Sequence, residues 1–285
     1  FLSFKNKITT GFFPLGFEKH SFKQLFSFGA KFQVINLLNI FFDPLIKYFI
    51  TKRFGLSSTA LYEIASKIVM QARNLLVSTN QVVTPKVAIH QLNGTSRVYI
   101  SAFFEKNILS AVALTFFLLV FSPYAGYYFL GTFNPLLQSA IIIITTGWFI
   151  NMVSAPLYFT AIGLGKIYSI ISVHFVQSGL IVLAFLLPVS VLNKQTPFIV
   201  PAFAVGFSAI YLILLLSDNL LLLHKKLIGV LLSALFFICV LFYISAVNFS
   251  FISNLIITGI SFILVCICLL LNRKWQTLLL SVYKD

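Results

Sequence analysis

Apolar segments of about 20 residues recur along this chain, and their length limits what it can fold into. The hydrocarbon core of a bilayer is about 30 Å thick, and an α-helix of about 20 apolar residues crosses it. Hydrophobic residues make up 59% of the sequence and charged residues 9%, whereas about a quarter of the residues in soluble domains are charged. The sequence therefore predicts an all-α, polytopic membrane helix bundle of about eight transmembrane helices. The predicted spans lie at about 27–51, 61–83, 106–129, 137–160, 167–190, 197–217, 227–247 and 251–271.

Basic and aromatic residues dominate the chain before the first span, where Pro14 and Gly16 disfavour a long helix. We expect residues 1–26 to be a cytoplasmic or interfacial segment on the membrane surface, and an ordinary loop is the alternative. Because the chain begins at Phe1 rather than at Met, we expect it to be the later part of a longer protein. The rest divides into a six-helix bundle, two accessory transmembrane helices and a cytoplasmic tail, at 27–217, 218–271 and 272–285.

The distribution of Lys and Arg predicts the topology. An even number of spans places both termini on one side, and 13 of the 20 basic residues fall on that side. Only Lys52, Arg53 and Lys194 fall on the other side, and the remaining four lie within the first two spans. By the positive-inside rule, both termini are cytoplasmic. The net charge of +14 then reflects topology and attraction to anionic membrane lipids, and the sequence offers no compact basic domain for nucleic acid.

Two acid–base pairs, Asp43 with Lys47 and Glu63 with Lys67, lie inside the first two spans. Ionisable groups at membrane depth cost free energy, so they usually face a bundle interior or a water-filled path. On helices of about 100° per residue, they belong to two polar stripes that amide side chains extend. A short outer turn at 52–58 makes the two helices antiparallel neighbours, so we expect the stripes to face each other or a shared cavity. The candidate substrate-binding or translocation residues are Asn36, Asn39, Asp43, Lys47, Glu63, Lys67, Arg73, Asn74 and Gln81.

Simple intrahelical pairing is the structural alternative for these charges. Each acid precedes a Lys by four residues, which is the favourable order for an ion pair on one helix. Such pairs explain four residues but leave the asparagines and glutamines of the stripes unexplained. A hydrated lumen explains both stripes, and we favour it for that reason.

Metal and redox chemistry find no support in the sequence. Cys266 and Cys268 are spaced to lie on nearly opposite helix faces, and Cys239 lies on another span. The four histidines are scattered, and only His174, near Gln177, has a position from which it could line a path; a hydrogen-bonded structural role is the alternative. We therefore expect no metal and no cofactor.

The last two spans are nearly featureless, which is typical of helices that lie against lipid. The functional centre is therefore expected within the first six spans. Pro44 and Pro156 each remove a backbone hydrogen bond inside a span and can kink the helix, either as a hinge for alternating access or as a static bend. Gly163 and Gly165 form a tight inner loop before Lys166, with no strand around it that would make a nucleotide-binding motif.

The run from Phe28 to Pro85 carries a family resemblance. It contains "FGAKFQVINLLNIFFDPLIKYFITKRFGLSSTALYEIASKIV" followed by "QVVTPKV". This run resembles the start of the second lobe of polysaccharide flippases of the multidrug/oligosaccharidyl-lipid/polysaccharide exporter superfamily. The shared features are a Phe-Gly opening, a mid-helix acid, a basic-Phe-Gly turn, Tyr-x-x-Ala and a closing Pro, here Phe28, Gly29, Asp43, Arg53 to Gly55, Tyr62, Ala65 and Pro85. The stretch "SAPLYFTAIGLGK", Ser154 to Lys166, is similar to the junction after their tenth helix.

The resemblance implies a MATE-like transporter with two six-helix lobes, of which this chain supplies the second lobe and two accessory helices. It implies that undecaprenyl-pyrophosphate-linked oligosaccharide is flipped across the bacterial inner membrane for surface polysaccharide (O-antigen, lipopolysaccharide) biosynthesis, commonly with an ion gradient. The lipid-linked oligosaccharide, membrane lipids and other polysaccharide-assembly membrane proteins are the implied partners. We expect Lys47, Lys67 and Arg73 to attract the pyrophosphate and the amides to bind sugar hydroxyls, with Asp43 and Glu63 holding the cations or taking up a coupling proton.

Three other functions remain open from the sequence. A MATE-like exporter of drugs or small molecules on the same fold would have the same pattern. A membrane polysaccharide polymerase or ligase shares the composition, but the outer connections are short and leave little room for catalytic residues, so we expect no enzyme. A purely structural membrane subunit would not need the two polar stripes.

Overall fold

The computed structural model describes residues 19–92, 96–184, 186 and 194–217, and within these it contains helices and turns without a strand. The prediction of an all-α fold is thereby confirmed for this part of the chain. The spans predicted at 227–247 and 251–271, with all three cysteines, lie outside the described residues. The helices are α1 (Lys19–Asn80), α2 (Val83–Leu92), α3 (Ser96–Leu130), α4 (Pro135–Gly163), α5 (Ile167–Ala184) and α6 (Thr196–Ser217).

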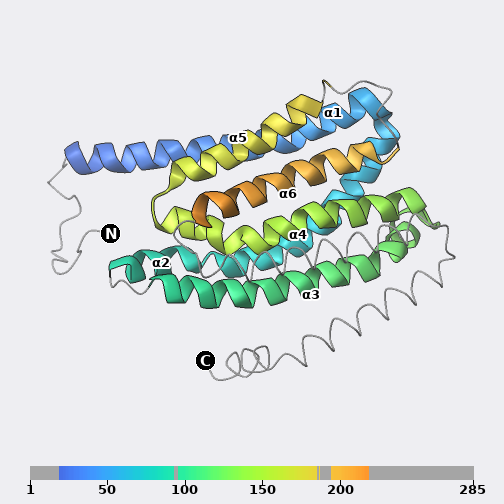
Figure 1. The fold of residues 1–285 in the computed structure, drawn as a ribbon. Coiled ribbons are helices and arrows are strands. Elements are labelled where there is room, and N and C mark those ends of the chain that lie inside the picture. Colours follow the sequence, from blue (N-terminus) through green and yellow to red (C-terminus); the bar gives the residue numbers. More distant parts are fainter. Residues whose placement is uncertain (1–18, 93–95, 185, 187–193, 218–285) are drawn as a thin grey trace, which may run out of the picture.

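Helix α1 consists of two arms that meet at Gly55. This residue has φ 85° and ψ 174°, a conformation outside the helical region that only glycine adopts easily. Without the bend, its 62 residues would extend for about 93 Å, far more than a bilayer core. The chain instead reverses, so that the first arm (19–54) and the second arm (56–80) run in opposite directions (Figure 1). Next to the bend, the Thr51 and Thr59 hydroxyls are hydrogen-bonded at 2.9 Å.

Five helical stretches of the described chain are long and apolar enough to cross a membrane. The first of them, Gly29–Ile89, includes both arms of α1, so each of the six spans predicted within 27–217 coincides with helix over most of its described residues. The span predicted at 167–190 continues past the end of α5 into residues that are not all described. Two details differ from the prediction. Helix α1 begins at Lys19, before the predicted start at 27, and the short helix α2 was not predicted.

Local sequence signals set both ends of α4. Asn134 caps the N-terminus, where its Oδ1 accepts from the Leu137 amide at 3.0 Å and Pro135 follows as the first helical residue. At the other end Gly165 has φ 70°, and the Lys166 amide donates to the Ala161 carbonyl at 2.8 Å. This is the Schellman arrangement, which terminates a helix at a glycine. The predicted tight loop before Lys166 is thus confirmed.

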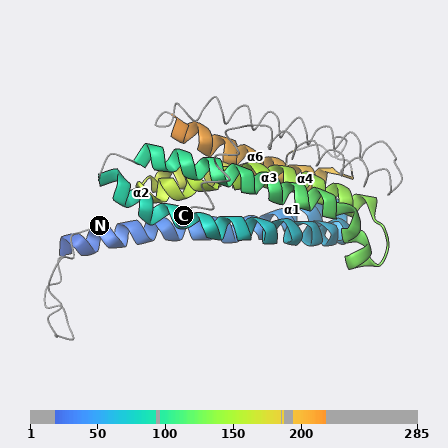
Figure 2. The ribbon, with the colours of Figure 1, turned by 90° about the horizontal axis from the view of Figure 1, so that it is seen from below.

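Helix α4 is the centre of the bundle and contacts each of the other five helices. Its closest approach is to α6, because a Cβ placed on Gly147 would collide with the backbone of Ala202. Seen from below, α4 lies among the other helices, while the first arm of α1 extends beyond them (Figure 2). Most residues of α4 are buried, so side chains on this helix meet protein rather than lipid.

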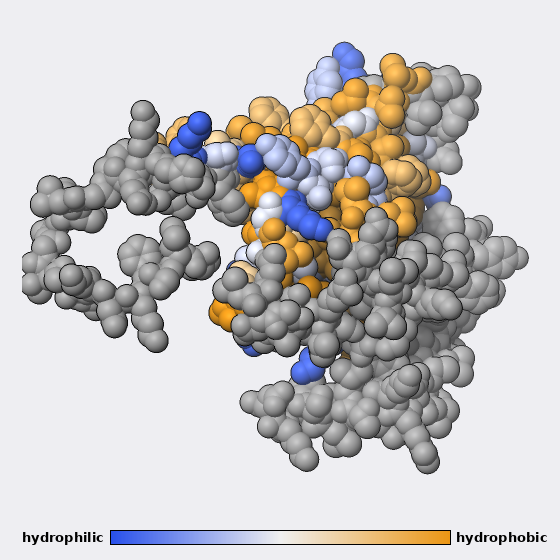
Figure 3. Space-filling model, turned by 60° about the vertical axis from the view of Figure 1, so that its left-hand side comes forward, coloured by the Kyte–Doolittle hydropathy of each residue, from blue (hydrophilic) through white to orange (hydrophobic). Residues whose placement is uncertain are grey.

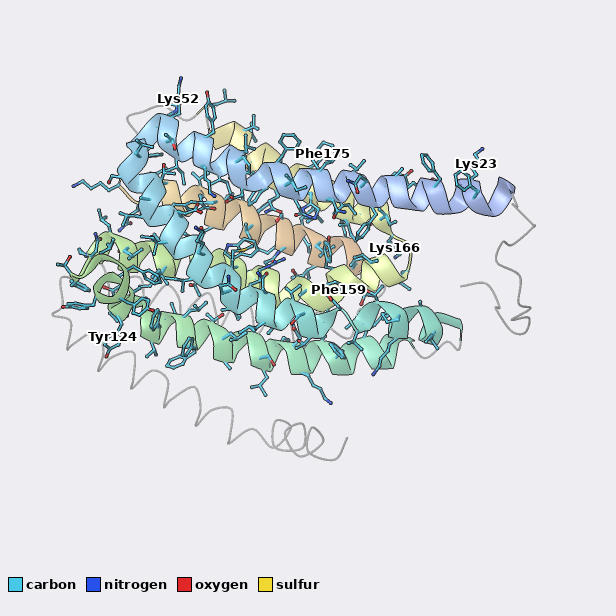
Figure 4. All side chains as sticks on the ribbon, turned by 180° about the vertical axis from the view of Figure 1, so that it is seen from behind. Lys23, Lys52, Tyr124, Phe159, Lys166 and Phe175 are labelled. Atoms are coloured by element: carbon cyan, nitrogen blue, oxygen red, sulfur yellow. The ribbon has the colours of Figure 1, made fainter. Side chains whose placement is uncertain are left out.

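The basic residues at the helix ends divide between two ends of the bundle. Lys23 and Lys166 lie toward one end and Lys52 toward the opposite end (Figure 4). The positive-inside assignment requires this relative placement. Which end faces the cytoplasm stays a prediction. Between the ends, exposed apolar side chains cover much of the visible described surface, and hydrophilic residues interrupt them (Figure 3).

Candidate functional site

Four charged side chains join the two arms of α1 in what we call the ion network: Asp43, Lys47, Glu63 and Lys67. The Lys47 Nζ lies 2.6 Å from Asp43 Oδ2 and 2.7 Å from Glu63 Oε2. The Lys67 Nζ lies 3.1 Å from Glu63 Oε1. Lys47 therefore bridges two carboxylates, one on each arm, and holds the arms together near the bend.

The network contains both intrahelical pairs of the structural alternative and one pair that crosses between the arms. Glu63 and Lys47 are about equally shielded, with side-chain exposures of 31% and 33%, whereas Lys67 is 72% exposed. Pairing thus accounts for the two lysines and the two acids. The polar stripes do face each other here, as expected from the sequence, and each lysine has a carboxylate beside it.

Arg73 is a cation of a different kind. It leaves the second arm toward α4, where its Nε donates to Asn151 Oδ1 at 2.9 Å. Its guanidinium also lies over the Trp148 ring, 4.8 Å from the ring centroid. Among the described residues, no carboxylate forms an ion pair with Arg73, and its hydrogen bond is made through Nε rather than through the two terminal Nη nitrogens.

Other polar groups surround the same position. Tyr158 of α4 is close enough to interact electrostatically with Arg73, and Asn39 of the first arm lies beside the Tyr158 hydroxyl. The His174 ring of α5 meets the Tyr158 ring edge to face, with centroids 6.1 Å apart. The His174 Nε2 is buried without a hydrogen-bond partner among the described residues. We call Arg73, Trp148, Asn151, Tyr158 and His174 the arginine site.

The structure separates the sequence-predicted residues into three groups. Asp43, Lys47, Glu63 and Lys67 form the ion network, whereas Arg73 and Asn39 belong to the surroundings of α4. Asn36 is partly buried, and Asn74 and Gln81 are exposed. The predicted stripes are therefore not one continuous lining. Their functional roles stay predictions.

Sequence reasoning missed Trp148, Asn151 and Tyr158. Asn151 was detectable, because a single Asn in the middle of an apolar span is a costly residue that needs a partner. Trp148 and Tyr158 gave no such signal, since aromatic residues are common throughout the chain. His174 was noticed as a possible lining residue and does lie at the arginine site.

The comparison with known families concerns the segment that contains the ion network and Arg73. The model of the family described as "Polysaccharide biosynthesis protein" matches residues 12–132. This part of the chain is therefore similar to that family. The match to the polysaccharide biosynthesis family confirms the resemblance to flippase-type proteins and supports a role in polysaccharide biosynthesis at the membrane. No curated protein and no solved structure matches the chain.

The matched segment covers α1, α2 and α3, so it contains the whole ion network and Arg73. The residues of the arginine site on α4 and α5 lie beyond it. The arginine site is thus formed where the family segment packs against the following helices. The described residues contain no group of three or more His, Cys, Asp or Glu side chains arranged to hold a metal ion.

Proposed function

We propose that this chain forms one wall of the path by which an undecaprenyl-pyrophosphate-linked oligosaccharide is flipped across the bacterial inner membrane. The single observation that carries the proposal is the state of Arg73, a cation that lies among helices with no carboxylate of the described residues beside it. An uncompensated charge at membrane depth is costly, and such charges usually serve a substrate or ion path.

The pairing pattern distinguishes Arg73 from the two lysines. Lys47 and Lys67 already have carboxylates within 3.1 Å, so an incoming anion would have to displace an existing partner. Arg73 has no such competitor among the described residues, and its Nη groups retain their N–H donors. A guanidinium presents these donors as a planar fork that fits a phosphate, which favours Arg over Lys for this role.

The neighbours of Arg73 favour an anion that carries a polar headgroup. Asn151 holds the Nε edge, Trp148 covers one face of the guanidinium, and Tyr158 and Asn39 add hydroxyl and amide groups nearby. Sugar hydroxyls exchange hydrogen bonds readily with such groups. A lipid-linked sugar with a pyrophosphate matches this combination, because it offers an anion and a hydroxyl-rich headgroup together.

The ion network has a separate part in the proposal. Asp43 and Glu63 hold Lys47 between the arms. We propose that one of these acids takes up a proton from a driving gradient. Transport of this kind needs no catalytic group, and we propose that the chain is not an enzyme. A drug exporter is the second candidate, but no contact of the described residues favours it over a lipid-linked anion.

The test replaces Arg73 in the intact protein within its host cell. Arg73→Ala is expected to abolish surface polysaccharide, Arg73→Lys to retain part of it, and Leu75→Ala, an exposed apolar neighbour on the same arm, to leave it unchanged. Membrane levels of each variant are measured on immunoblots. Wild-type polysaccharide in Arg73→Ala, at normal protein levels, would refute the proposal.

A further inference from the structure

Pro156 interrupts the backbone hydrogen bonding of α4 close to the arginine site. In a regular helix the amide of residue 156 would donate to the carbonyl of Met152, four residues earlier. Proline has no amide hydrogen, so that carbonyl loses its helical partner. Met152 is fully buried, and a buried carbonyl without a donor costs free energy.

The missing donor comes from another helix. Asn107 of α3 donates through Nδ2 to the Met152 carbonyl at 2.9 Å and, more weakly, to the Val153 carbonyl at 3.4 Å. The Asn107 Oδ1 in turn accepts from Asn80 Nδ2 at 2.6 Å, at the end of the second arm. Asn80 and Asn107 are only 1% and 5% exposed, so water does not replace these bonds easily.

The gap at Pro156 lies between two parts of the arginine site. Trp148 and Asn151 precede the proline along α4, whereas Tyr158 follows it. A change of bend at Pro156 therefore moves Trp148 and Asn151 relative to Tyr158. Because the closing donor belongs to α3, the backbone of α4 at Pro156 is tied to the position of α3 and, through Asn80, to the arm that carries Arg73.

At a second proline in the bundle, the carbonyl that lost its helical donor receives a hydrogen bond from the same helix. Pro123 in α3 likewise removes the donor to the carbonyl of Leu119, and here Ser122 of the same helix donates to that carbonyl at 2.8 Å. That bond stays intact when neighbouring helices move, because donor and acceptor lie on one helix. The bond at Pro156 has no such independence.

We propose that Asn107 and Pro156 form a hinge that transport uses, in which Asn107 is the positioning residue that sets the bend of α4. The hinge inference rests on the proposed transport function. When the Met152 carbonyl exchanges the Asn107 donor for another donor, α4 changes its bend. The arginine site then rearranges around its ligand. The Asn80–Asn107 pair couples this change to the second arm.

Double substitution separates a hinge from a static structural bond. Asn107→Leu leaves the Met152 carbonyl without a donor, so its thermal unfolding midpoint in detergent is expected to fall by about 3 °C or more. Pro156→Ala supplies a backbone amide to that carbonyl, so N107L/P156A is expected to unfold near the wild-type temperature. If the bend serves transport, the double variant nevertheless loses surface polysaccharide, since α4 is held straight.

The matched control is the proline of α3. Ser122→Ala with Pro123→Ala is expected to retain both stability and polysaccharide, because the donor to the Leu119 carbonyl lies on the same helix. Wild-type polysaccharide in N107L/P156A would overturn the hinge, and wild-type stability of N107L alone would overturn the role of Asn107. If Arg73→Ala retains polysaccharide, the proposed transport function is refuted. The unfolding temperatures of N107L and N107L/P156A still test the role of Asn107.

Discussion

Arg73 and Asn151 are joined across two helices by a hydrogen bond of 2.9 Å from the guanidinium Nε to the amide Oδ1. Nε is the inner nitrogen of the guanidinium, so this bond fixes the orientation of the group and leaves both Nη nitrogens for a ligand. The bond also ties the second arm of α1 to the buried centre of α4. We regard this pair as the core of the arginine site.

Substitution of Asn151 tests whether Arg73 must stay without a carboxylate partner, as it is among the described residues. Asn151→Asp places a carboxylate where the amide oxygen now accepts, so we expect an ion pair that competes with an anionic substrate. The variant should reach normal membrane levels and lose most surface polysaccharide. Asn151→Gln, which stays neutral, is the control, and equal polysaccharide in the two variants would contradict the argument.

Lys47 is expected to matter for the stability of the hairpin. Lys47→Met removes the cation that pairs with both Asp43 and Glu63 and leaves Glu63 with Lys67 alone, so the free energy of unfolding should fall by about 1 kcal/mol. Lys67→Met is the control, since Lys67 is largely exposed and forms one longer pair. Thermal unfolding in detergent measures both, and an equal loss in the two variants would argue against the bridging role.

The bend at Gly55 predicts a purely conformational cost. Gly55→Ala meets no atom within 4 Å, yet its φ of 85° lies in a region that alanine rarely adopts. We expect a loss of about 1–3 kcal/mol. Gly29→Ala in the first arm has the same open surroundings without the positive φ, and it should be neutral or slightly stabilising. If both variants unfold alike, the conformation at Gly55 carries no cost.

Close packing of α4 on α6 gives a second steric prediction. A methyl group on Gly147 would collide with the Ala202 backbone, which cannot move as a flexible side chain does. Gly147→Ala should therefore destabilise the bundle by about 1–3 kcal/mol or separate the two helices. Gly179→Ala on α5 has open space around it and serves as the comparison. Equal thermal unfolding midpoints would show that α4 and α6 do not pack this closely.

The positions of the helices were largely predictable because their physical cause is local. Apolar length determines where a chain can cross a bilayer, and the acid–base spacing of four residues determines which side chains share a face. Both intrahelical pairs of the ion network follow from that spacing alone.

The partners of these residues were less predictable, because they depend on which helices pack together. The turn at Gly55 was expected as a loop at 52–58, but helix continues on both sides of a single non-helical residue, and this geometry brings Lys47 to Glu63. Asn151 reaches Arg73 only because α4 packs at the centre of the bundle. Periodicity within one helix carries no information about its neighbour, so Trp148 and Tyr158 were missed.

The distribution of the lipid-linked oligosaccharide between the two membrane leaflets tests the central claim most directly. The measurement compares wild-type cells with cells carrying Arg73→Ala, with a label on the sugar and a probe that reaches only the outer leaflet. If Arg73 receives the pyrophosphate, the labelled lipid should accumulate in the inner leaflet of the Arg73→Ala cells and reach the probe in wild type. Equal access of the probe to the labelled lipid in both cells, at equal protein levels, would contradict the account.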